Sequence, residues 1–476
     1  MTYELTIKLL PELYTVFHFF SLIAAIHAGL TVRTSQGAVA WTVSLVAFPP
    51  VALPLYLAFG RKKFKGYIET LRKINAGNKN SLIKLLAPIS RYKISSKETK
   101  LEYFDSLTKL PASRNNSVDL LIDGTETFNA IFNAIDRAEK YILIEFFIVR
   151  DDETGNRLKD HLIARAETGV KIFFLYDEVG SRKLDHQYIL QMRRAGINIL
   201  PFWTTQGIGN RFQINFRNHR KIVVVDGSIA FIGGHNVGDE YLGLSRKFGH
   251  WRDTHVKIKG PAVQSVQLIF TEDWYWSARS RPDVDLRSEP ARDGNMDAIV
   301  LPSGPASKLE VCSLMFVQLI NLAKKRLWIA SPYFVPNQAV VVALQLAALR
   351  GVKIRIMLPL KPDHLLVYLA SYSFLYQMSH SNIRFFRYED GFMHQKVVLV
   401  DDDLSLVGTA NADNRSFYLN FEVGILVHDA DFACDVEKML KADFLKCRES
   451  GIRDYESKSW VFKLGVRLSH LFAPVI

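Results

Sequence analysis

Two short segments of the chain place a lysine two residues after a histidine and an aspartate five residues after the lysine. The first is HRKIVVVD (219–226) and the second is HQKVVLVD (394–401). Residues two apart on a strand point to the same face. Imidazole serves as a nucleophile or as an acid and base, and ammonium stabilises phosphate oxygens, so each segment is suited to phosphoryl chemistry. The candidate pairs are His219 with Lys221 and His394 with Lys396.

Asp226 and Asp401 complete the two motifs and are candidate catalytic residues. Strict alternation along a strand places them on the face opposite the histidines, unless the strand ends there. We therefore expect that holding a turn or neighbouring backbone is at least as important for them as contact with substrate.

The two copies match further along the chain. After six intervening residues, Asp226 is followed by GGHN (233–236) and Asp401 by GTAN (408–411). A glycine lets backbone approach a ligand closely, and Asn or Thr beside it can donate to a phosphate oxygen. The predicted substrate-binding residues are Gly234, Asn236, Thr409 and Asn411.

A later carboxylate is also repeated. WRDTHVKIKG (251–260) aligns without gaps to NFEVGILVHD (420–429) when Asp253 is set against Glu422. A nucleophilic histidine needs one ring nitrogen neutral and the other donating to an acceptor. Asp253 and Glu422 are predicted to orient the two imidazoles in this way.

Two histidines beside one phosphorus atom allow a two-step displacement. One imidazole attacks and becomes a phosphohistidine, and the other protonates the leaving alkoxide and then deprotonates the incoming hydroxyl. Lysines and asparagines would stabilise the non-bridging oxygens. The sequence shows no cluster with metal-ligand spacing, and this chemistry requires neither a metal nor a cofactor.

The elements that must position these residues are also duplicated. A helix leading into a buried strand is predicted over 133–149 and again over 318–335, and a further strand over 169–177 and 351–359. Strands alternating with helices predict two α/β domains, and the fixed order means two copies of one fold. If the copies pack about a pseudo-twofold axis, both His/Lys faces meet in one cleft.

The amino-terminal end has the pattern of a membrane hairpin. Residues 13–32 and 38–60 carry no Asp, Glu, Lys or Arg, and each run is long enough to span a bilayer. Pro49, Pro50 and Pro54 interrupt the second run, which either kinks or re-enters, but we predict two spans. RKKFK (61–65) follows, and the positive-inside rule places it and the body of the protein on the cytoplasmic side.

Charge indicates anionic partners. The formal net charge is +12, and residues 61–110 contribute +9 of it, with 13 Lys/Arg against 4 Asp/Glu. A basic stretch next to membrane spans is predicted to lie on anionic lipid headgroups, although a solvated linker has the same composition. The three cysteines show no pairing pattern, as expected in a reducing compartment.

Together these motifs resemble the phospholipase D superfamily, whose mark is a doubled H-x-K-x4-D segment. The two hydrophobic runs, SPYFVP (331–336), VGTANADNRSFYLNFE (407–422) and the ending at 472–474 resemble bacterial cardiolipin synthases in particular. The resemblance covers essentially the whole chain.

The resemblance implies a reaction and a fold. Members of this family join two phosphatidylglycerol molecules into cardiolipin and free glycerol, and their two α/β/α units pack about one active site. It implies that the two His/Lys/Asp sets are catalytic, and it favours His219 as the nucleophile and His394 as the acid and base. One departure concerns Gly234, where the superfamily often has Ser. The backbone N–H of Gly234 and the amide of Asn236 are then the expected donors in the first copy.

The predicted organisation follows from these points. Residues 1–60 form a two-helix membrane hairpin, 61–110 a basic juxtamembrane linker, 111–290 a first phospholipase D-like domain and 291–476 a second one. Residues 460–472 carry Trp460, Leu464, Leu468 and Leu471 on one helical face, which suits either an interfacial helix or a helix packed on the core.

Three alternatives share much of this evidence. A hydrolytic phospholipase D would use the same residues with water as acceptor, and a phosphodiesterase nuclease of the same fold would also suit the positive charge. No nucleic-acid-binding motif is present, and a lipid-binding scaffold would not need two intact His/Lys sets. The predicted partners are therefore phosphatidylglycerol and anionic membrane lipids, and the predicted location is the bacterial inner membrane. The sequence predicts no oligomeric state.

Overall fold

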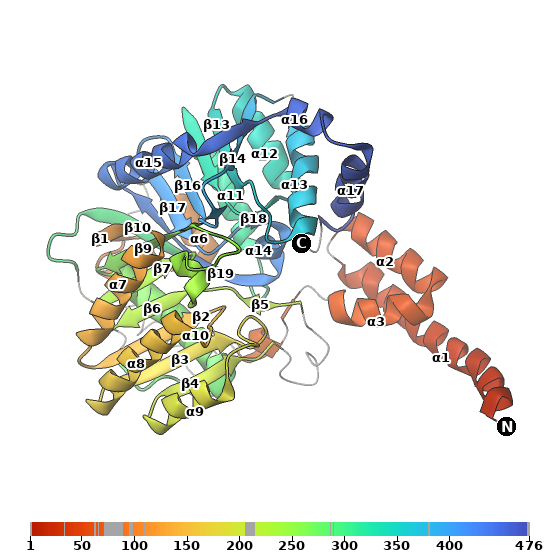
Figure 1. Ribbon diagram of the computed structural model, residues 1–476, viewed down its shortest axis with the longest axis horizontal. Helices are drawn as coiled ribbons and strands as arrows, with labels where there is room; N and C mark the ends of the chain where they lie inside the picture. Colours follow the sequence, from red (N-terminus) through yellow and green to blue (C-terminus); the bar gives the residue numbers. More distant parts are fainter. Residues whose placement is uncertain are drawn as a thin grey trace. The chain divides into compact units, whose positions relative to one another are not determined.

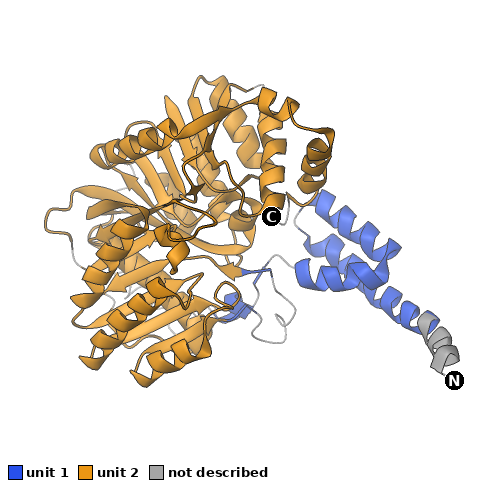
Figure 2. Cartoon of the chain, viewed as in Figure 1, with its two compact units in different colours: residues 1–70, 203–216 blue, residues 71–202, 217–476 orange. Residues whose placement is uncertain are grey.

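The protein is described by a computed structural model. The structure describes residues 2–32, 34–60, 63–64, 66–70, 89–94, 99–108, 110–204, 215–285, 287–288, 290–378 and 381–473. Much of the predicted basic linker, residues 71–88 and 95–98, lies outside the described residues. The chain divides into two compact units, residues 1–70 with 203–216 and residues 71–202 with 217–476 (Figure 2).

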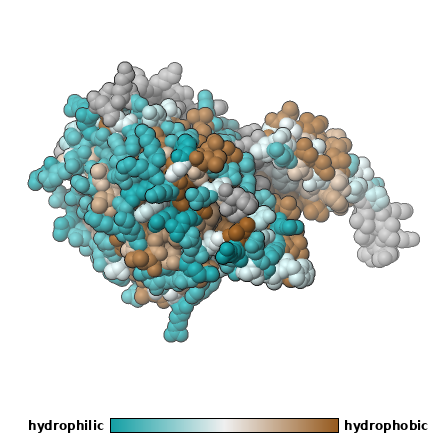
Figure 3. All heavy atoms as spheres, turned by 90° about the horizontal axis from the view of Figure 1, so that it is seen from above, coloured by the Kyte–Doolittle hydropathy of each residue, from teal (hydrophilic) through white to brown (hydrophobic). Residues whose placement is uncertain are grey.

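The smaller unit contains three helices from the two hydrophobic runs, and apolar side chains cover much of their surface (Figure 3). The second run forms two helices rather than one, because Pro49 and Pro50 cannot donate backbone hydrogen bonds to a continuing helix. Phe48 lies between them with φ −134°. The His27 ring bonds the Tyr56 hydroxyl at 2.7 Å. The helices are α1 (Thr2–Thr31), α2 (Ser35–Ala47) and α3 (Pro49–Phe59).

Within the described residues, one helix is long and apolar enough to cross a membrane, over Pro11–Thr31. The break at Phe48 leaves α2 with 13 residues and α3 with 11, each shorter than a typical span. The prediction of a second span stays a prediction.

The larger unit is built on one mixed sheet in which the two copies lie side by side (Figure 1). Strands of the first copy are β1 (Ser113–Ile122), β2 (Tyr141–Phe146), β3 (Lys171–Asp177), β4 (Asn198–Phe202), β6 (Ile222–Val225), β7 (Ile229–Gly233) and β9 (Thr254–Lys259). Those of the second are β10 (Met296–Ser303), β11 (Arg326–Ala330), β13 (Lys353–Pro359), β14 (Ile383–Tyr388), β16 (Val397–Val400), β17 (Leu404–Gly408), β19 (Asn420–His428) and β20 (Cys447–Ser450).

Apart from the edge strand β20, equivalent strands of the two copies follow the same order inward from the two ends of the sheet. It runs β14-β13-β11-β16-β17-β19-β10 in the second copy and then β1-β9-β7-β6-β2-β3-β4 in the first. The copies meet where β1 pairs with β10 antiparallel, with Ser113 opposite Ala298. Equivalent strands are therefore placed symmetrically about this junction, which confirms the predicted pseudo-twofold arrangement.

Helices cover both faces of the sheet because its strands are apolar on both sides. In β3, Phe173 packs on Trp274 of α10 at 5.1 Å, whereas Phe174 lies in the core on the other face. The helices of the first copy are α7 (Asp123–Asp136), α8 (Glu153–Glu167), α9 (His186–Arg194) and α10 (Ala262–Ala278), with a 3-10 turn, η2 (Asp239–Leu242).

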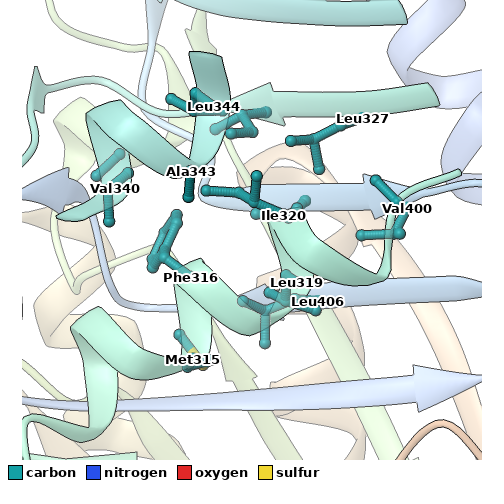
Figure 4. Packing of buried hydrophobic residues seen from close by; sticks show 14 of the residues in the cluster. Met315, Phe316, Leu319, Ile320, Leu327, Val340, Ala343, Leu344, Val400 and Leu406 are labelled. Carbon is teal, nitrogen blue, oxygen red and sulfur yellow. The ribbon is translucent and has the colours of Figure 1, made fainter. Parts of the chain in front are cut away.

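The second copy repeats this plan. Leu319 and Ile320 of α11 pack against Val400 and Leu406 of the sheet (Figure 4). α6 (Glu102–Thr108) precedes the first copy, and the helices of the second are α11 (Val311–Leu322), α12 (Gln338–Leu349), α13 (Leu365–Met378), α14 (Asn414–Tyr418) and α15 (Ala430–Leu445). The second copy then continues through β20, α16 (Ile452–Glu456) and α17 (Trp460–His470), for which the described part of the first copy has no equivalent.

Short strands join the two copies beside the two His/Lys/Asp motifs. β5 (Arg217–Asn218) pairs parallel with β19, and β15 (Phe392–Met393) pairs parallel with β8 (Trp251–Arg252). A third short pair, β12 (Phe334–Val335) with β18 (Ala412–Asp413), lies within the second copy. The residues before each motif histidine therefore run beside the segment that leads into the other copy's carboxylate, Glu422 within β19 or Asp253 directly after β8.

Candidate active site

Each motif histidine is fixed by the backbone of the other copy. The His219 N–H donates to the carbonyl of Phe421 at 2.9 Å, and the His394 N–H donates to the carbonyl of Arg252 at 2.8 Å. Both side chains are buried. The two hydrogen bonds are equivalent under the pseudo-twofold relation, so the same packing places both imidazoles at the interface between the copies.

The carboxylates are exchanged between the copies. His219 Nδ1 lies 2.9 Å from Glu422 Oε2, and His394 Nδ1 lies 2.6 Å from Asp253 Oδ2. Each copy thus supplies the carboxylate for the histidine of the other. An Nδ1–H that donates to a carboxylate leaves the lone pair of a neutral imidazole on Nε2, the nitrogen available for attack on phosphorus or for proton transfer.

Burial keeps both imidazoles neutral near pH 7. It lowers the pKa of His219 to about 4, against the opposing effect of Glu422. It also lowers the pKa of His394 to about 4, with Lys396 acting in the same direction. Burial alone would raise the pKa of Glu422, but the neighbouring His219 and Lys221 lower it, so the carboxylate stays ionised.

The two lysines lie beside their histidines and carry buried positive charge. Lys221 Nζ donates to the His219 carbonyl at 2.7 Å, and Lys396 Nζ donates to the His394 carbonyl. Burial lowers the pKa of Lys221 to about 7 and that of Lys396 to about 8. A bound anion would favour the ammonium forms, as expected of a site for a phosphate group.

Asp226 and Asp401 hold the turns that precede two equivalent strands. The Asp226 carboxylate accepts backbone hydrogen bonds from Glu139, Lys140 and Tyr141 at 2.7–2.8 Å. Asp401 accepts the equivalent bonds at 2.7–3.2 Å, from Lys324, Lys325 and Arg326. Both aspartates have positive φ, 52° and 51°, where the strand turns. Both carboxylates therefore hold a turn of the backbone in place.

The N–H of Gly234, a predicted donor to substrate, has a partner within the protein. It donates to the Thr254 carbonyl at 3.0 Å within the sheet. A glycine is needed there for another reason: a Cβ would lie 1.9 Å from Asp253 Oδ1. In the second copy Thr409 fills this position, and its hydroxyl donates to Glu422 Oε2 at 2.6 Å.

The two asparagines have different surroundings. Asn236 Oδ1 accepts the Ile148 N–H at 3.1 Å, so part of its amide supports the fold. Asn411 donates its backbone N–H to Ser416 Oγ at 3.1 Å, and its buried amide oxygen has no hydrogen-bond partner among the described residues. Asn411 thus keeps a buried hydrogen-bond acceptor that the described part of the protein does not use.

Residues that the sequence reasoning missed support the motifs from behind. Arg220, between the motif His and Lys, contacts the buried Asp273 carboxylate and donates from Nε to the Glu422 carbonyl at 3.1 Å. In the second copy Gln395 donates to Asp443 at 2.8 Å, and Arg252 also binds Asp443 at 2.7 and 2.8 Å. The alternation of side-chain direction along a strand is the signal that indicates them, because a polar residue between His and Lys must point into the core and find a partner there.

The glutamate that contacts His219 has a second polar shell. Ser416 Oγ donates to Glu422 Oε1 at 2.8 Å and Asn420 Nδ2 to the same oxygen at 3.2 Å. With Thr409, three side-chain donors besides His219 fix this carboxylate. Asp253 has the backbone N–H of Thr254 at 2.8 Å and the indole N–H of Trp251 at 3.4 Å.

Comparison with solved structures shows that this fold occurs in another protein. The phosphatidylserine synthase of Haemophilus influenzae superposes with a TM-score of 0.61 at 17% identity, over 79% of this chain and 100% of that one. The family described as "Cardiolipin synthase, PLD-like domain" matches residues 131–274 and 316–444, one segment in each copy.

Full-length relatives define the family more closely. Cardiolipin synthase A of Pseudomonas fluorescens is 47% identical over 469 residues, 98% of either chain. Cardiolipin synthase A of Pseudomonas aeruginosa is 47% identical over 459 residues, 95% of this chain and 94% of the relative. The chain belongs to the cardiolipin synthase family and is a phosphatidyltransferase of the phospholipase D type.

Proposed function

We propose that the protein condenses two phosphatidylglycerol molecules into cardiolipin and glycerol. The observation that carries this proposal is the pair of exchanged contacts, His219 with Glu422 and His394 with Asp253, which set two neutral imidazoles at one interface. Family membership points to phosphatidyl transfer, and a transfer through a covalent intermediate needs two groups of this kind.

In the first step, Nε2 of His219 attacks the phosphorus of one phosphatidylglycerol. The bond from phosphorus to the headgroup glycerol oxygen breaks, and that oxygen takes a proton from His394. The anionic phosphate raises the pKa of His394, so that this imidazole enters the step protonated. Glycerol leaves, and the phosphatidyl group stays on His219.

In the second step, the terminal hydroxyl of another phosphatidylglycerol attacks the same phosphorus. His394 takes the hydroxyl proton, the new P–O bond forms and the P–N bond to His219 breaks. Cardiolipin leaves, and both imidazoles return to their starting forms. Lys221 and Lys396 stabilise the non-bridging oxygens in both steps.

The remaining site residues have supporting roles in this proposal. Glu422 and Asp253 hold the imidazoles in the required tautomer, and Asn411 offers its amide to the bound lipid. Thr409 acts through Glu422, and Gly234 makes room for Asp253. Asp226 and Asp401 keep the turns before β2 and β11 in place, and so act on the chemistry indirectly.

Membrane association is expected of this family, and we propose a more specific arrangement. The helices α1 to α3 anchor the chain as a two-pass hairpin in the bacterial inner membrane, with the catalytic unit on the cytoplasmic side. The apolar surface of α1 and the positive charge after residue 60 support this. Labelling of single cysteines placed in 34–36 and in the catalytic unit, with an impermeant reagent on intact and permeabilised cells, tests it.

The reaction is tested with the purified full-length chain in phosphatidylglycerol vesicles, with products read by mass spectrometry. Cardiolipin and glycerol in equal amounts are the expected result. Phosphatidic acid without cardiolipin would show a hydrolase instead. Cleavage of single-stranded DNA without any lipid product would show a nuclease.

A further inference from the structure

Helix α17 and the two residues that follow it expose an apolar stripe, called the α17 stripe, at the carboxyl end of the second copy. Along the helix its members recur at intervals of about one turn, so they lie on one side. A surface formed by six large apolar side chains is unusual on a protein that faces water alone. The stripe consists of Trp460 (75% exposed), Val461 (58%), Leu464 (46%), Leu468 (52%), Leu471 (73%) and Phe472 (51%).

The opposite side of α17 is packed, which fixes the direction of the stripe. The Phe462 ring lies 5.1 Å from that of Tyr372 on α13, and Val466 is buried with Tyr372 and Tyr455 in a small core. Core packing and an exposed apolar stripe, which appeared as alternatives in the sequence, are therefore two faces of the same helix.

The charges around the stripe suit an anionic surface. Residues 459–473 contain Lys463 and Arg467 and no Asp or Glu. Arg467 is exposed, and Ser459 caps the first turn by accepting the Phe462 N–H. A helix with aromatic and aliphatic residues on one side and basic residues beside them is typical of segments that lie in the plane of a lipid headgroup layer.

The end of the stripe is tied to the catalytic site. Asn414 Nδ2 donates to the Ala473 carbonyl at 2.8 Å, directly after Phe472. Two residues beyond Asn414, Ser416 donates to Glu422, and Glu422 holds His219. A surface that contacts lipid at α17 would therefore be joined, through two hydrogen bonds and the short helix that carries Asn414 and Ser416, to the residues that must receive a lipid phosphate.

We propose that the α17 stripe docks on the surface of an anionic phospholipid bilayer and holds the active site at headgroup level. This inference rests on the proposed function, because that function places the substrate in a bilayer. It explains why the second copy carries β20, α16 and α17 in addition to the repeated fold. The first copy, over residues 111–285, exposes few large apolar side chains, namely Ile122, Trp203 and Leu244 among the described residues.

Docking is tested by fluorescence on the full-length chain in phosphatidylglycerol vesicles. Cys434 and Cys447 are replaced by serine, and an environment-sensitive dye is attached to cysteine in the variant Leu464→Cys. Lys438→Cys on α15, where the side chain is 71% exposed, is the matched control. Acyl-chain quenchers should quench the dye at 464 at least about threefold more strongly than at 438. Equal quenching at the two positions would overturn the proposal. Shielding of the dye at 464 that disappears when the protein is diluted in lipid would also overturn it, because a second copy of the chain would then be what covers the stripe.

An activity test separates docking from chemistry. The double variant Leu464→Gln/Leu468→Gln should form cardiolipin about fivefold or more slowly on vesicles, and at the normal rate on phosphatidylglycerol in detergent micelles. Leu445→Gln, at a position 89% exposed on α15, should be normal in both. A normal rate of the double variant on vesicles, or equal loss in both media, would refute docking. Absence of cardiolipin from the unaltered protein would count against the proposed function instead, while the quenching result would still stand.

Discussion

The two histidine sites are equivalent in topology and unequal in chemistry. His219 is held by a glutamate that receives three further side-chain hydrogen bonds, whereas His394 is held by an aspartate that lies against a glycine. The longer glutamate leaves room for Thr409 at the position where Asp253 requires Gly234. The choice of glycine or threonine in the motif is thus tied to the choice of carboxylate.

This difference matters because the two imidazoles perform different tasks in the proposed mechanism. A nucleophile must keep one orientation while a covalent bond forms and breaks, and a tightly held carboxylate provides that. A proton carrier needs instead a pKa that responds to the charge of the bound phosphate. The more rigid support of His219 agrees with its assignment as the nucleophile.

The largest expected effect comes from removing either imidazole. His219→Ala and His394→Ala should each lower cardiolipin formation by at least about 10⁴-fold, because both steps need both groups. The two variants should differ in one respect. With a substrate whose leaving group needs no proton, such as a p-nitrophenyl phosphodiester, His394→Ala should still release nitrophenol in a burst, and His219→Ala should not.

Thermal melting of both variants serves as the control, since small changes in stability would exclude misfolding. A burst from His219→Ala with none from His394→Ala would reverse the two assignments. Full turnover by either variant would remove the two-histidine mechanism.

The carboxylates should come next and should be unequal. Every hydrogen-bond partner of the two Glu422 oxygens is a donor. In Glu422→Gln the amide NH₂ group would therefore face donors instead of accepting from them, and it would also favour the wrong tautomer of His219. We expect a loss in kcat of about 10³-fold for Glu422→Gln and about 10²-fold for Asp253→Asn. Steady-state rates on phosphatidylglycerol vesicles measure both. Equal losses would show that the hydrogen bonds from Thr409, Ser416 and Asn420 to Glu422 do not affect the chemistry.

The lysines set the pH dependence. The nucleophile His219 must be neutral to attack and has a pKa of about 4, so kcat/KM should rise with pH until this imidazole is neutral. Above about pH 7 Lys221 loses its proton and its stabilising charge, so kcat/KM should fall again. Lys221→Met should lower the rate by about 10²-fold and move the alkaline limb to about 8, where Lys396 titrates. An alkaline limb unchanged in Lys221→Met would mean that another group causes it.

Much of this arrangement was predictable from the sequence, and the exceptions have physical reasons. The repeated helix and strand patterns predict the two α/β copies, and the repeated His, Lys and Asn positions predict their shared site. Both predictions succeed because strand alternation and fixed spacing are local properties. The exchange of Glu422 and Asp253 between copies depends on how β5 lies against β19 and β15 against β8, which no local pattern encodes. The hydrogen bond from the Gly234 N–H to Thr254 depends in the same way on a sheet partner that is distant in the sequence.

The buried supports were missed for a related reason. Arg220 and Gln395 occupy the variable position of each motif, and their partners, Asp273 and Asp443, lie on helices about fifty residues away in the chain. The hydrophobic run at 38–60 shows the opposite case. Its length predicts a second span and its prolines predict a kink or a re-entrant turn, and the local rule for Pro49 and Pro50 divides it at Phe48.

The smallest expected effect on activity belongs to the two turn-holding aspartates, whose hydrogen bonds are equivalent in the two copies. Asp226→Asn and Asp401→Asn keep a side chain that tolerates positive φ but lose the charge that three backbone N–H groups share in each turn. Each should cost about 2 kcal/mol of stability, since these are charge-assisted hydrogen bonds. Thermal unfolding should therefore show a clear loss, while kcat per folded molecule should fall by less than about tenfold, far less than in the histidine variants. Loss of turnover with an unchanged melting temperature would instead place these carboxylates in the chemistry.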